Sequence, residues 1–359
     1  MQVIRQNSKH SDVITLDRDG SQEQFISTTG DGSDELSAFD VLPPAQGNVV
    51  AQLAFGGCGF HDAARARMGG ADWPLLWLEG DVCPGTDVSG TQAFTINGEI
   101  RRVELAGRVV GSYWSDADAD YCLLAGIMPA DLSSGRGAQT SSSLEQIEAA
   151  LQKAGMDFSH VVRTWFYLDK LLDWYDEFNV ARTNFFETRG VFERLIPAST
   201  GIGARNPASA ALAAGALAIR PRHSGVRIHE VESPLQCAAT EYRSSFSRAV
   251  EVEFPDHRFL TISGTASIAP GGESMFADDT AKQIHLTLDV VEGILKSRGM
   301  DWQNTTRAVG YFYDINALPI FEACCRERGI APLPIVPAHA IVCRADLLFE
   351  MELDAVAVL

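Results

Sequence analysis

The chain has 359 residues, of which 46% are hydrophobic and 21% are charged, a composition typical of a globular protein with two ordinary domains or three small ones. Its 29 Lys and Arg residues against 47 Asp and Glu residues give a net charge of -18. A field this negative argues against nucleic acid and anionic membranes as partners. A small anionic substrate would also be repelled at long range, so a pocket for one must contain arginines that reverse the local sign.

The start of the chain lacks the apolar core of a signal peptide, and no apolar run reaches roughly 18 residues, so we expect a soluble, cytoplasmic protein. The cysteines are odd in number and show neither a CxxC pair nor zinc-ligand spacing. We therefore expect reduced thiols and no structural metal. These cysteines are Cys58, Cys83, Cys122, Cys237, Cys324, Cys325 and Cys343.

The first forty or so residues are polar and rich in Gly, Ser and Asp, which predicts a loosely held segment, with compact structure beginning near Val49. Residues 48–105 contain short strand-like runs separated by turns, such as WPLLWLEGDV and QAFTINGEIRRVEL. The Asn97-Gly98 pair in the second run is a hairpin signal.

A stretch of the chain from about 105 to 221 has a definite order of elements. The strand YCLLAGIMPAD is followed by SSLEQIEAALQKAGMD, whose apolar residues share one helical face that ends at Gly155. The strand VVRTWFYLD, the helix WYDEFNVARTNFFETRG and the strands PASTGIG and ALAAGALAI complete the set.

The same order returns between about 228 and 359. The matching segments are FLTISGTASIAPGG, AKQIHLTLDVVEGILKSRGMD, TTRAVGYFYD, a helix around FEACCRERG, and PAHAIVCRADLLFEMELDAVAV. The register is close enough to pair single residues, which predicts two duplicated α/β units. The pairs are Gln139 with Gln283, Gly155 with Gly299, Arg163 with Arg307, and Pro197 with Pro337.

This order of elements, with VVRTWFYLD after a helix ending in AGM and VCRADLLFEMELDAVA at the end, resembles the RidA (YjgF-like) family in both repeats. The resemblance implies helices on one face of a mixed sheet, trimeric packing of units and ligand pockets at the seams between them. We therefore expect an α+β fold of two tandem RidA/YjgF-like (chorismate-mutase-like) units in a pseudo-trimer-like arrangement, with a β-rich N-terminal extension. The expected domains are 1–225, made of extension 1–104 and degenerate unit 105–225, and 226–359, which carries the main catalytic residues.

A fused double unit with the strings DADADYC, IPASTGIG, SPLQCAATEYRSSFSRAVE, ISGTASI and VCRADLLFE also resembles the chorismatase family. The resemblance implies cleavage of chorismate to pyruvate and either a dihydroxycyclohexadiene carboxylate or a hydroxybenzoate, without a metal or organic cofactor. Chorismate is a dianion with an enol ether, and cleavage of an enol ether begins with protonation of its methylene carbon. One well-placed carboxylic acid is the minimum equipment for this reaction.

Glu350 is the candidate acid, because it lies in the apolar strand LLFEMELDA and burial would keep its carboxyl protonated near neutral pH. The alternatives are that it is a surface carboxylate, or that Glu352 on the same face has this role. The matching stretch of the first repeat, GIGARNPASAALAAGALAI, has Ala or Gly opposite both positions. One working site per chain is therefore expected.

Arg344 and Arg163 are candidates for binding the two substrate carboxylates, because a guanidinium offers a bidentate fork. Either could instead form an internal salt bridge, and the matching Arg307 suggests a structural role for Arg163. The resemblance implies an Arg early in the final hairpin and a Glu later on as pocket residues, which correspond to Arg344 and Glu350.

Cys343 directly precedes Arg344 and could reach the same pocket from the paired final strands, although most single cysteines are small buried hydrophobes. The family resemblance implies that a Cys here accompanies the members that form 3-hydroxybenzoate. Further candidates for substrate binding are Gly264 in SGTAS, where a ligand could approach the backbone, and polar side chains that could orient ring hydroxyls. Those side chains are Tyr121, Gln236 and Tyr242, each of which could equally be a core or interface residue.

The leading interpretation is a chorismatase that forms 3-hydroxybenzoate and acts as a monomer or small homo-oligomer. The diol-forming reaction, a RidA-type imine or enamine deaminase, and a binding module without activity remain alternatives. The sequence contains no P-loop, dinucleotide fingerprint, HExxH or GxSxG motif, so nucleotide, metalloprotease and serine hydrolase chemistry have no support.

Overall fold

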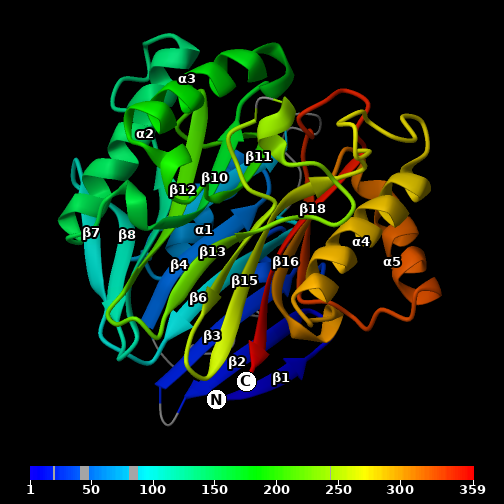
Figure 1. Cartoon of the computed structure of the whole chain (residues 1–359), viewed down its shortest axis with the longest axis horizontal. Helices are drawn as coiled ribbons and strands as arrows, with labels where there is room; N and C mark the ends of the chain where they lie inside the picture. Colours follow the sequence, from blue (N-terminus) through cyan, green and yellow to red (C-terminus); the bar gives the residue numbers. More distant parts are fainter. Residues whose placement is uncertain (19–20, 41–47, 81–87, 243) are drawn as a thin grey trace.

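The computed structural model of this chain describes residues 1–18, 21–40, 48–80, 88–242 and 244–359. Its strands form a 12-stranded sheet and a 6-stranded sheet, which together contain three units of one topology (Figure 1). We name them the N-terminal unit (residues 2–96), the middle unit (101–221) and the C-terminal unit (227–358).

The middle and C-terminal units repeat each other strand for strand. Their sheets have the orders β7-β8-β9-β12-β10-β11 and β13-β14-β15-β18-β16-β17, so the predicted duplication is confirmed. The middle unit consists of β7 (Arg101–Leu105), β8 (Arg108–Ser115), β9 (Ala119–Ile127), α2 (Arg136–Lys153), β10 (Val161–Leu168), α3 (Tyr175–Thr188), β11 (Ala198–Arg205) and β12 (Leu212–Pro221). The C-terminal unit consists of β13 (Arg227–Val231), β14 (Ala249–Glu253), β15 (His257–Ala266), α4 (Thr280–Ser297), β16 (Thr305–Phe312), α5 (Leu318–Glu327), β17 (Ile335–His339) and β18 (Phe349–Val358).

Matched residues of the two units make equivalent hydrogen bonds. Gln139 and Gln283 are both buried. Gln139 donates to two carbonyls in the loop before α2. Gln283 donates to one carbonyl in the loop before α4 and to one in the β17–β18 connection. Each also accepts a backbone N–H just before the last strand of its unit. Such satisfied amides fix a helix against a sheet, because an unpaired buried amide would be costly.

The N-terminal unit has the same strand order, β1-β2-β3-β6-β4-β5. The expectation that the first forty residues are loosely held is therefore wrong, because their backbone groups are paired in a sheet. In the described part of the β3–β4 connection there is only a short 3-10 helix, Ser37–Phe39, where the other units have a long helix. The elements are β1 (Gln2–Asn7), β2 (Ser11–Arg18), β3 (Ser21–Thr29), β4 (Asn48–Phe55), α1 (His61–Arg67), β5 (Leu75–Gly80) and β6 (Gly90–Ile96).

The hairpin predicted at Asn97-Gly98 does not form. β6 pairs with β3 and β4 on its two sides, so it has no free edge for β7, which pairs with β8 at the far end of the same sheet. The Asn97 side chain accepts the backbone N–H of Gln22 instead. The dipeptide therefore marks the junction between two units.

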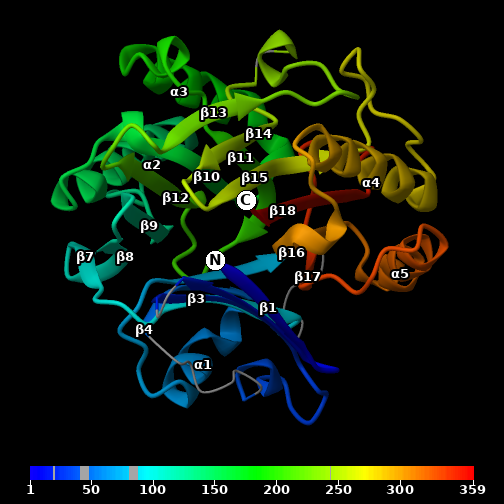
Figure 2. The same cartoon turned by 60° about the horizontal axis from the view of Figure 1, so that its bottom comes forward.

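The three units surround a common interior, with their sheets facing inward and their helices outward (Figures 1 and 2). The N-terminal and middle units join where β5 pairs with β11, and the middle unit meets the C-terminal unit where Gly203 and Ile341 exchange two backbone hydrogen bonds of 2.7 and 3.2 Å. A Cβ on Gly203 would lie 2.9 Å from the Ile341 side chain, so this approach requires glycine. One apolar cluster contains residues of all three units.

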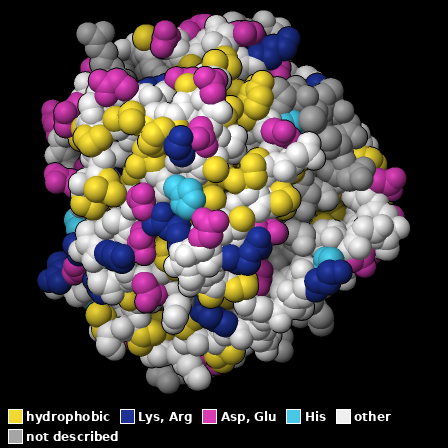
Figure 3. All heavy atoms as spheres, turned by 90° about the vertical axis from the view of Figure 1, so that its right-hand side faces the viewer, with side chains coloured by type: hydrophobic (Ala, Val, Ile, Leu, Met, Phe, Trp, Pro, Cys, Tyr) yellow, Lys and Arg dark blue, Asp and Glu magenta, His cyan; other side chains and the backbone are white. Residues whose placement is uncertain are grey.

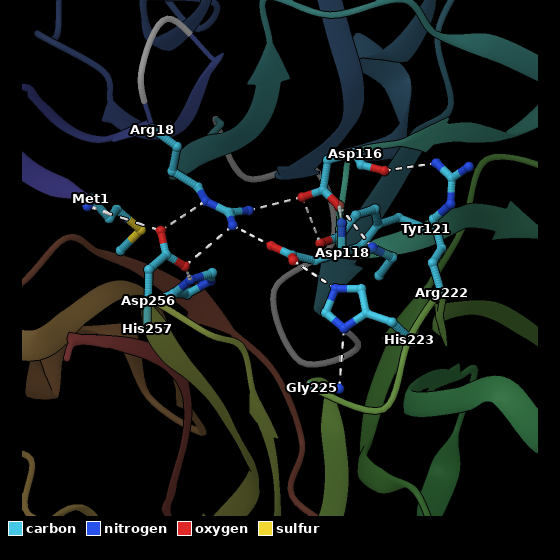
Figure 4. A network of polar contacts seen from close by, with 11 residues as sticks. Met1, Arg18, Asp116, Asp118, Tyr121, Arg222, His223, Gly225, Asp256 and His257 are labelled. Atoms are coloured by element: carbon cyan, nitrogen blue, oxygen red, sulfur yellow. Dashed lines mark hydrogen bonds and ion pairs between the residues drawn. The ribbon is translucent and has the colours of Figure 1, made fainter.

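The equivalent hairpins of the three units also converge, and Arg18 binds them together (Figure 4). Arg18, at the end of β2, forms ion pairs with Asp116 and Asp118 in the β8–β9 turn and with Asp256 in the β14–β15 turn. The predicted pseudo-trimer is therefore connected by polar contacts as well as by its core.

The surface shown in Figure 3 intersperses acidic, basic and apolar side chains instead of collecting one sign of charge. Among the described residues, no helix is both long and apolar enough to cross a membrane. We propose a boundary between two domains at residues 225/226, within the connection from β12 to β13.

Candidate active site

A cavity of about 800 Å³ lies between the middle and C-terminal units, within the usual size range of small-molecule sites. Helix α3 and strand β11 form one wall, and β15, β18 and the β17–β18 connection form the other. Part of the long connection between β13 and β14 closes it. A seam between two units is where the family resemblance placed the ligand pocket.

Cys343, Arg344 and Glu350 all line this cavity. Their expected setting on a pair of adjacent final strands is wrong, because β17 and β18 lie on opposite sides of β16. β17 runs parallel to β16, so the chain must cross the end of the sheet before β18 can return antiparallel on the other side. Cys343 and Arg344 lie on this crossing connection, and Glu350 begins the return strand.

Glu350 is buried, with 5% of its surface exposed, at the cavity end of β18. Its carboxyl lies directly over Gly264 of β15, where a Cβ would overlap Oε1 and lie 3.0 Å from Cδ. Burial and the neighbouring Glu352 raise the pKa of Glu350 to about 8. Its carboxyl has no hydrogen-bond or ion-pair partner among the residues that the structure describes, so it is a protonated acid open to a ligand.

Glu352, the rival acid, does not line the cavity. Its fully buried carboxylate accepts from Arg163 Nη2 at 2.8 Å and from Trp165 Nε1 at 3.1 Å, and it also pairs with Arg307. Burial would raise the pKa of Glu352, but the two arginines outweigh it and hold that pKa below its usual range. Two carboxyls two residues apart on one strand therefore have opposite protonation states.

Arg163 is fully buried and bound to Glu352 and Thr200, so the structure does not bring it to the cavity wall. This placement does not support the prediction that Arg163 binds a substrate carboxylate. It agrees with the structural role suggested by the match with Arg307. Thr200 links Arg163 to β15, because the Thr200 Oγ1 also accepts the backbone N–H of Gly264 at 3.0 Å, directly beneath Glu350.

Cys343 is half-buried beside this acid and packs against two apolar clusters. Burial and the nearby Glu350 raise the pKa of the Cys343 thiol to about 12. The side chain is therefore a neutral thiol at pH 7. It can fill space and donate a weak hydrogen bond, but it cannot serve as a thiolate base or nucleophile.

Three arginines line the cavity, as the strongly negative chain requires for an anionic substrate. Arg344 donates to the Gly272 carbonyl at 2.7 Å. Sequence reasoning missed the other two, Arg182 and Arg248, which are both buried. Arg182 could have been found, because it occupies the apolar face of α3 with Phe178, four residues earlier, and its guanidinium lies 4.9 Å from that ring.

The remaining candidates have different positions. Gly264 lines the cavity beneath Glu350, whereas Tyr121 lies elsewhere and donates to Asp116. Gln236 is buried behind the cavity, where its Nε2 donates to the carbonyls of Ala266 and Ile268 at 3.0 Å. The side chain of Tyr242 lies outside the described part of the structure.

The middle unit has no acid at the matching positions. Tyr311 faces Glu350 across the β16–β18 pair, and the corresponding Tyr167 faces Ala213 across β10–β12. The register also places Gly215 where the C-terminal unit has Glu352. The middle unit thus contributes helix α3 and β11 as a wall, and the C-terminal unit contributes the acid.

The chain has clear relatives among known proteins. A family profile described as chorismatase FkbO/Hyg5-like, N-terminal, matches residues 106–218. A chorismatase of Streptomyces hygroscopicus is 26% identical over 300 residues, which cover 76% of this chain and 83% of that protein. The chain is thus similar in sequence to a chorismatase over most of its length.

Two further comparisons agree with this similarity. A 3-hydroxybenzoate synthase of Streptomyces hygroscopicus is 27% identical over 263 residues, covering 66% of this chain and 74% of the relative. A crystal structure of a chorismatase superposes with a TM-score of 0.66 at 18% identity, covering 96% of this chain and 99% of that chain. The predicted α+β fold is thereby confirmed over almost the whole chain.

Proposed function

We propose that this protein is a chorismatase, which cleaves the enol ether of chorismate to release pyruvate and 3-hydroxybenzoate. The observation that carries the proposal is the buried, protonated Glu350 at the wall of a cavity lined by three arginines. A neutral acid and a positive wall are what cleavage of a dianionic enol ether requires.

In the proposed first step, Glu350 protonates the methylene carbon of the enol ether and leaves an oxocarbenium ion. The raised pKa of Glu350, about 8, keeps the proton available at neutral pH. Loss of pyruvate, with participation of the neighbouring ring hydroxyl, and loss of a ring proton then give the aromatic product. Chorismate has the same atoms as pyruvate plus 3-hydroxybenzoate, so this route consumes no water overall.

The substrate carboxylates are assigned to the arginines of the cavity. Arg344 enters from the β17–β18 connection, Arg182 from α3 and Arg248 from the end of the β13–β14 connection. Because a guanidinium binds a carboxylate in a bidentate fork, guanidinium groups on different walls can fix both the ring and the enolpyruvyl group. We assign Arg344 to one of the two carboxylates.

Cys343 is assigned to the choice of product. Its neutral thiol excludes water from the acid and can donate a hydrogen bond to the ring hydroxyl that takes part in departure of pyruvate. The diol requires addition of one water molecule, and 3-hydroxybenzoate does not. A larger void at this position would therefore favour the diol.

The test is chromatography of a chorismate reaction with the purified protein, the Cys343→Ala variant and the control Cys325→Ala on α5. We expect equal amounts of pyruvate and 3-hydroxybenzoate from the unmodified protein and from the control, and more diol from Cys343→Ala. An unchanged product ratio in Cys343→Ala would remove the thiol from the mechanism. Pyruvate with diol alone would correct the product, and absence of pyruvate would overturn the proposed reaction.

A further inference from the structure

A second cavity, separate from the catalytic one, lies at the centre of the three units. It has a volume of about 130 Å³ and is lined by strands of every unit. Among the residues that the structure describes, none lines both cavities. Trp165 stands between them, because its ring borders the central cavity and its Nε1 donates to Glu352 beneath the catalytic acid.

The walls of the central cavity are apolar and rich in aromatic rings. Inward-facing side chains such as Phe94, Leu123 and Leu217 are only partly buried although they belong to the interior cluster. Close-packed interiors rarely leave such surface without a partner, and an empty apolar cavity is destabilising. The aromatic rings at the wall are Phe25, Phe94, Trp114, Tyr121, Trp165, Phe254 and Phe259.

Several polar side chains interrupt this apolar lining, and Glu23 is the one whose role is open. Glu23 of β3 lies at the cavity wall, and its carboxyl has no hydrogen-bond partner within the described ranges of the chain. Burial and the neighbouring Asp116 raise the pKa of Glu23 to about 7. Tyr121 and His257, which also line the cavity, are already bonded to Asp116 and Asp256 of the Arg18 network (Figure 4). Glu23 thus offers a carboxyl that can hydrogen-bond to an occupant.

We propose that this central cavity is a second ligand site, which binds one uncharged, single-ring aromatic molecule whose hydroxyl group bonds to Glu23. An apolar cavity of about 150 Å³ accommodates benzene, so a space of this order of size can hold one aromatic ring. The aromatic rings of the wall provide edge and face contacts to the bound ring.

The charges around the cavity select an uncharged occupant. Tyr121 and His257 at one end are bonded to Asp116 and Asp256, so a carboxylate there would meet the repulsion of nearby acids as well as the cost of leaving water. At another part of the wall, Arg307 is already paired with Asp354. The anionic substrate and products of the proposed reaction therefore do not fit this site.

Calorimetric titration of the whole protein with phenol, benzene and benzoate tests the proposal. We expect saturable one-to-one binding of phenol, weaker binding of benzene and none of benzoate. Ala93→Leu, in β6 at the cavity wall, should fill the space and raise the Kd for phenol by about tenfold or more. Its turnover of chorismate should be unchanged, because Ala93 lies outside the catalytic cavity.

Glu23→Gln provides a second variant if Ala93→Leu does not fold. It keeps the shape of the side chain, so it should weaken phenol binding while leaving benzene binding unchanged. Failure of phenol to bind, equal binding of benzoate, or an unchanged phenol Kd in Ala93→Leu would each overturn the proposal. These outcomes are independent of whether chorismate is the substrate of the other cavity.

Discussion

Arg163 and Arg307, which occupy the same position in two repeated units, bind the same carboxylate, that of Glu352. The duplicated arginine therefore does not provide two equivalent sites. It holds one buried anion at the seam, two residues from the acid of the proposed reaction. The pair of arginines balances Glu352, and Glu352 in turn discourages ionisation of Glu350.

Replacement of Glu352 by Gln should move the pH dependence of turnover. The negative charge of Glu352 raises the pKa of Glu350, and Arg163 lowers it. Without that charge the nearby arginine acts unopposed, so Glu350 should lose its proton at a lower pH. We expect the alkaline fall of kcat/KM to shift to lower pH by one unit or more, measured from pH 5 to 10.

The same substitution should also destabilise the protein by about 3–5 kcal/mol, because two buried arginines lose their partner. Thermal unfolding should therefore accompany the kinetics, with rates referred to the folded fraction. Glu322→Gln, on the exposed face of α5, is the matched control. A large loss of stability with an unmoved pH profile would show that Glu352 is structural only.

Glu350→Gln should lower kcat by about 10²- to 10⁴-fold, the usual contribution of a general acid, with little change in stability. In the unmodified protein the pKa of Glu350 is raised to about 8, so the active protonated form dominates below that pH. We expect activity to fall tenfold per pH unit above it. Binding of a chorismate analogue should persist in the variant, and full turnover by Glu350→Gln would exclude this residue as the acid.

Gly264→Ala should impair catalysis by displacing the acid. The new Cβ would overlap Oε1 of Glu350 and lie 3.2 Å from Thr200 Cγ2, so the carboxyl must leave its position. We expect at least a tenfold loss of kcat. Gly271→Ala is the control, because there the Cβ meets only the flexible, exposed Glu273 side chain. Equal activity of both variants would show that the position of Glu350 over Gly264 is not required.

Arg344→Lys should raise KM more than it lowers kcat, because an ammonium keeps the charge but loses the bidentate fork. An increase of about tenfold corresponds to one charge-assisted hydrogen bond. Arg326→Lys, on the exposed side of α5, should leave both constants unchanged. If KM in Arg344→Lys equals that of the control, Arg344 does not contact a substrate carboxylate.

Arg18→Gln should reduce the free energy of unfolding by about 1–3 kcal/mol, because three carboxylates lose a shared, mostly buried cation. Burial would raise the pKa of Asp118, but hydrogen bonds from Arg18 and His223 hold it below its usual range. The stabilisation is therefore present above about pH 4 and is lost as the pH falls through the lowered pKa. The free energy of unfolding, measured by chemical denaturation, should differ less between pH 7 and pH 3 in the variant than in the unmodified protein.

The sequence predicted the two later units because their elements are complete and their matched residues, such as Gln139 and Gln283, have the same local partners. It could not show the N-terminal unit as a repeat. There the connection after β3 has no long helix in its described part, so the alternation of helix and strand that marks the other units is broken. Asn97-Gly98 also looked like a turn within one sheet.

At the site, the sequence located Glu350, Arg344 and Cys343 because all three lie close together in one segment of the chain, residues 343–350. Arg248 was not found, because its place in the cavity depends on how the β13–β14 connection folds over a neighbouring unit. Arg163 and Tyr121 have ordinary strand contexts in sequence. Only tertiary contacts show that their partners are Glu352 and Asp116 instead of a ligand.

Joining three units in one polypeptide removes a constraint that binds any symmetric homotrimer. In a homotrimer each substitution appears at all three equivalent seams, so a buried acid would have to be tolerated three times. Here the middle unit has Ala213 and Gly215 where the last unit has Glu350 and Glu352. In a single chain each copy can differ from the others, so the buried acid stands in one unit and its neighbours are free of the cost of burying it.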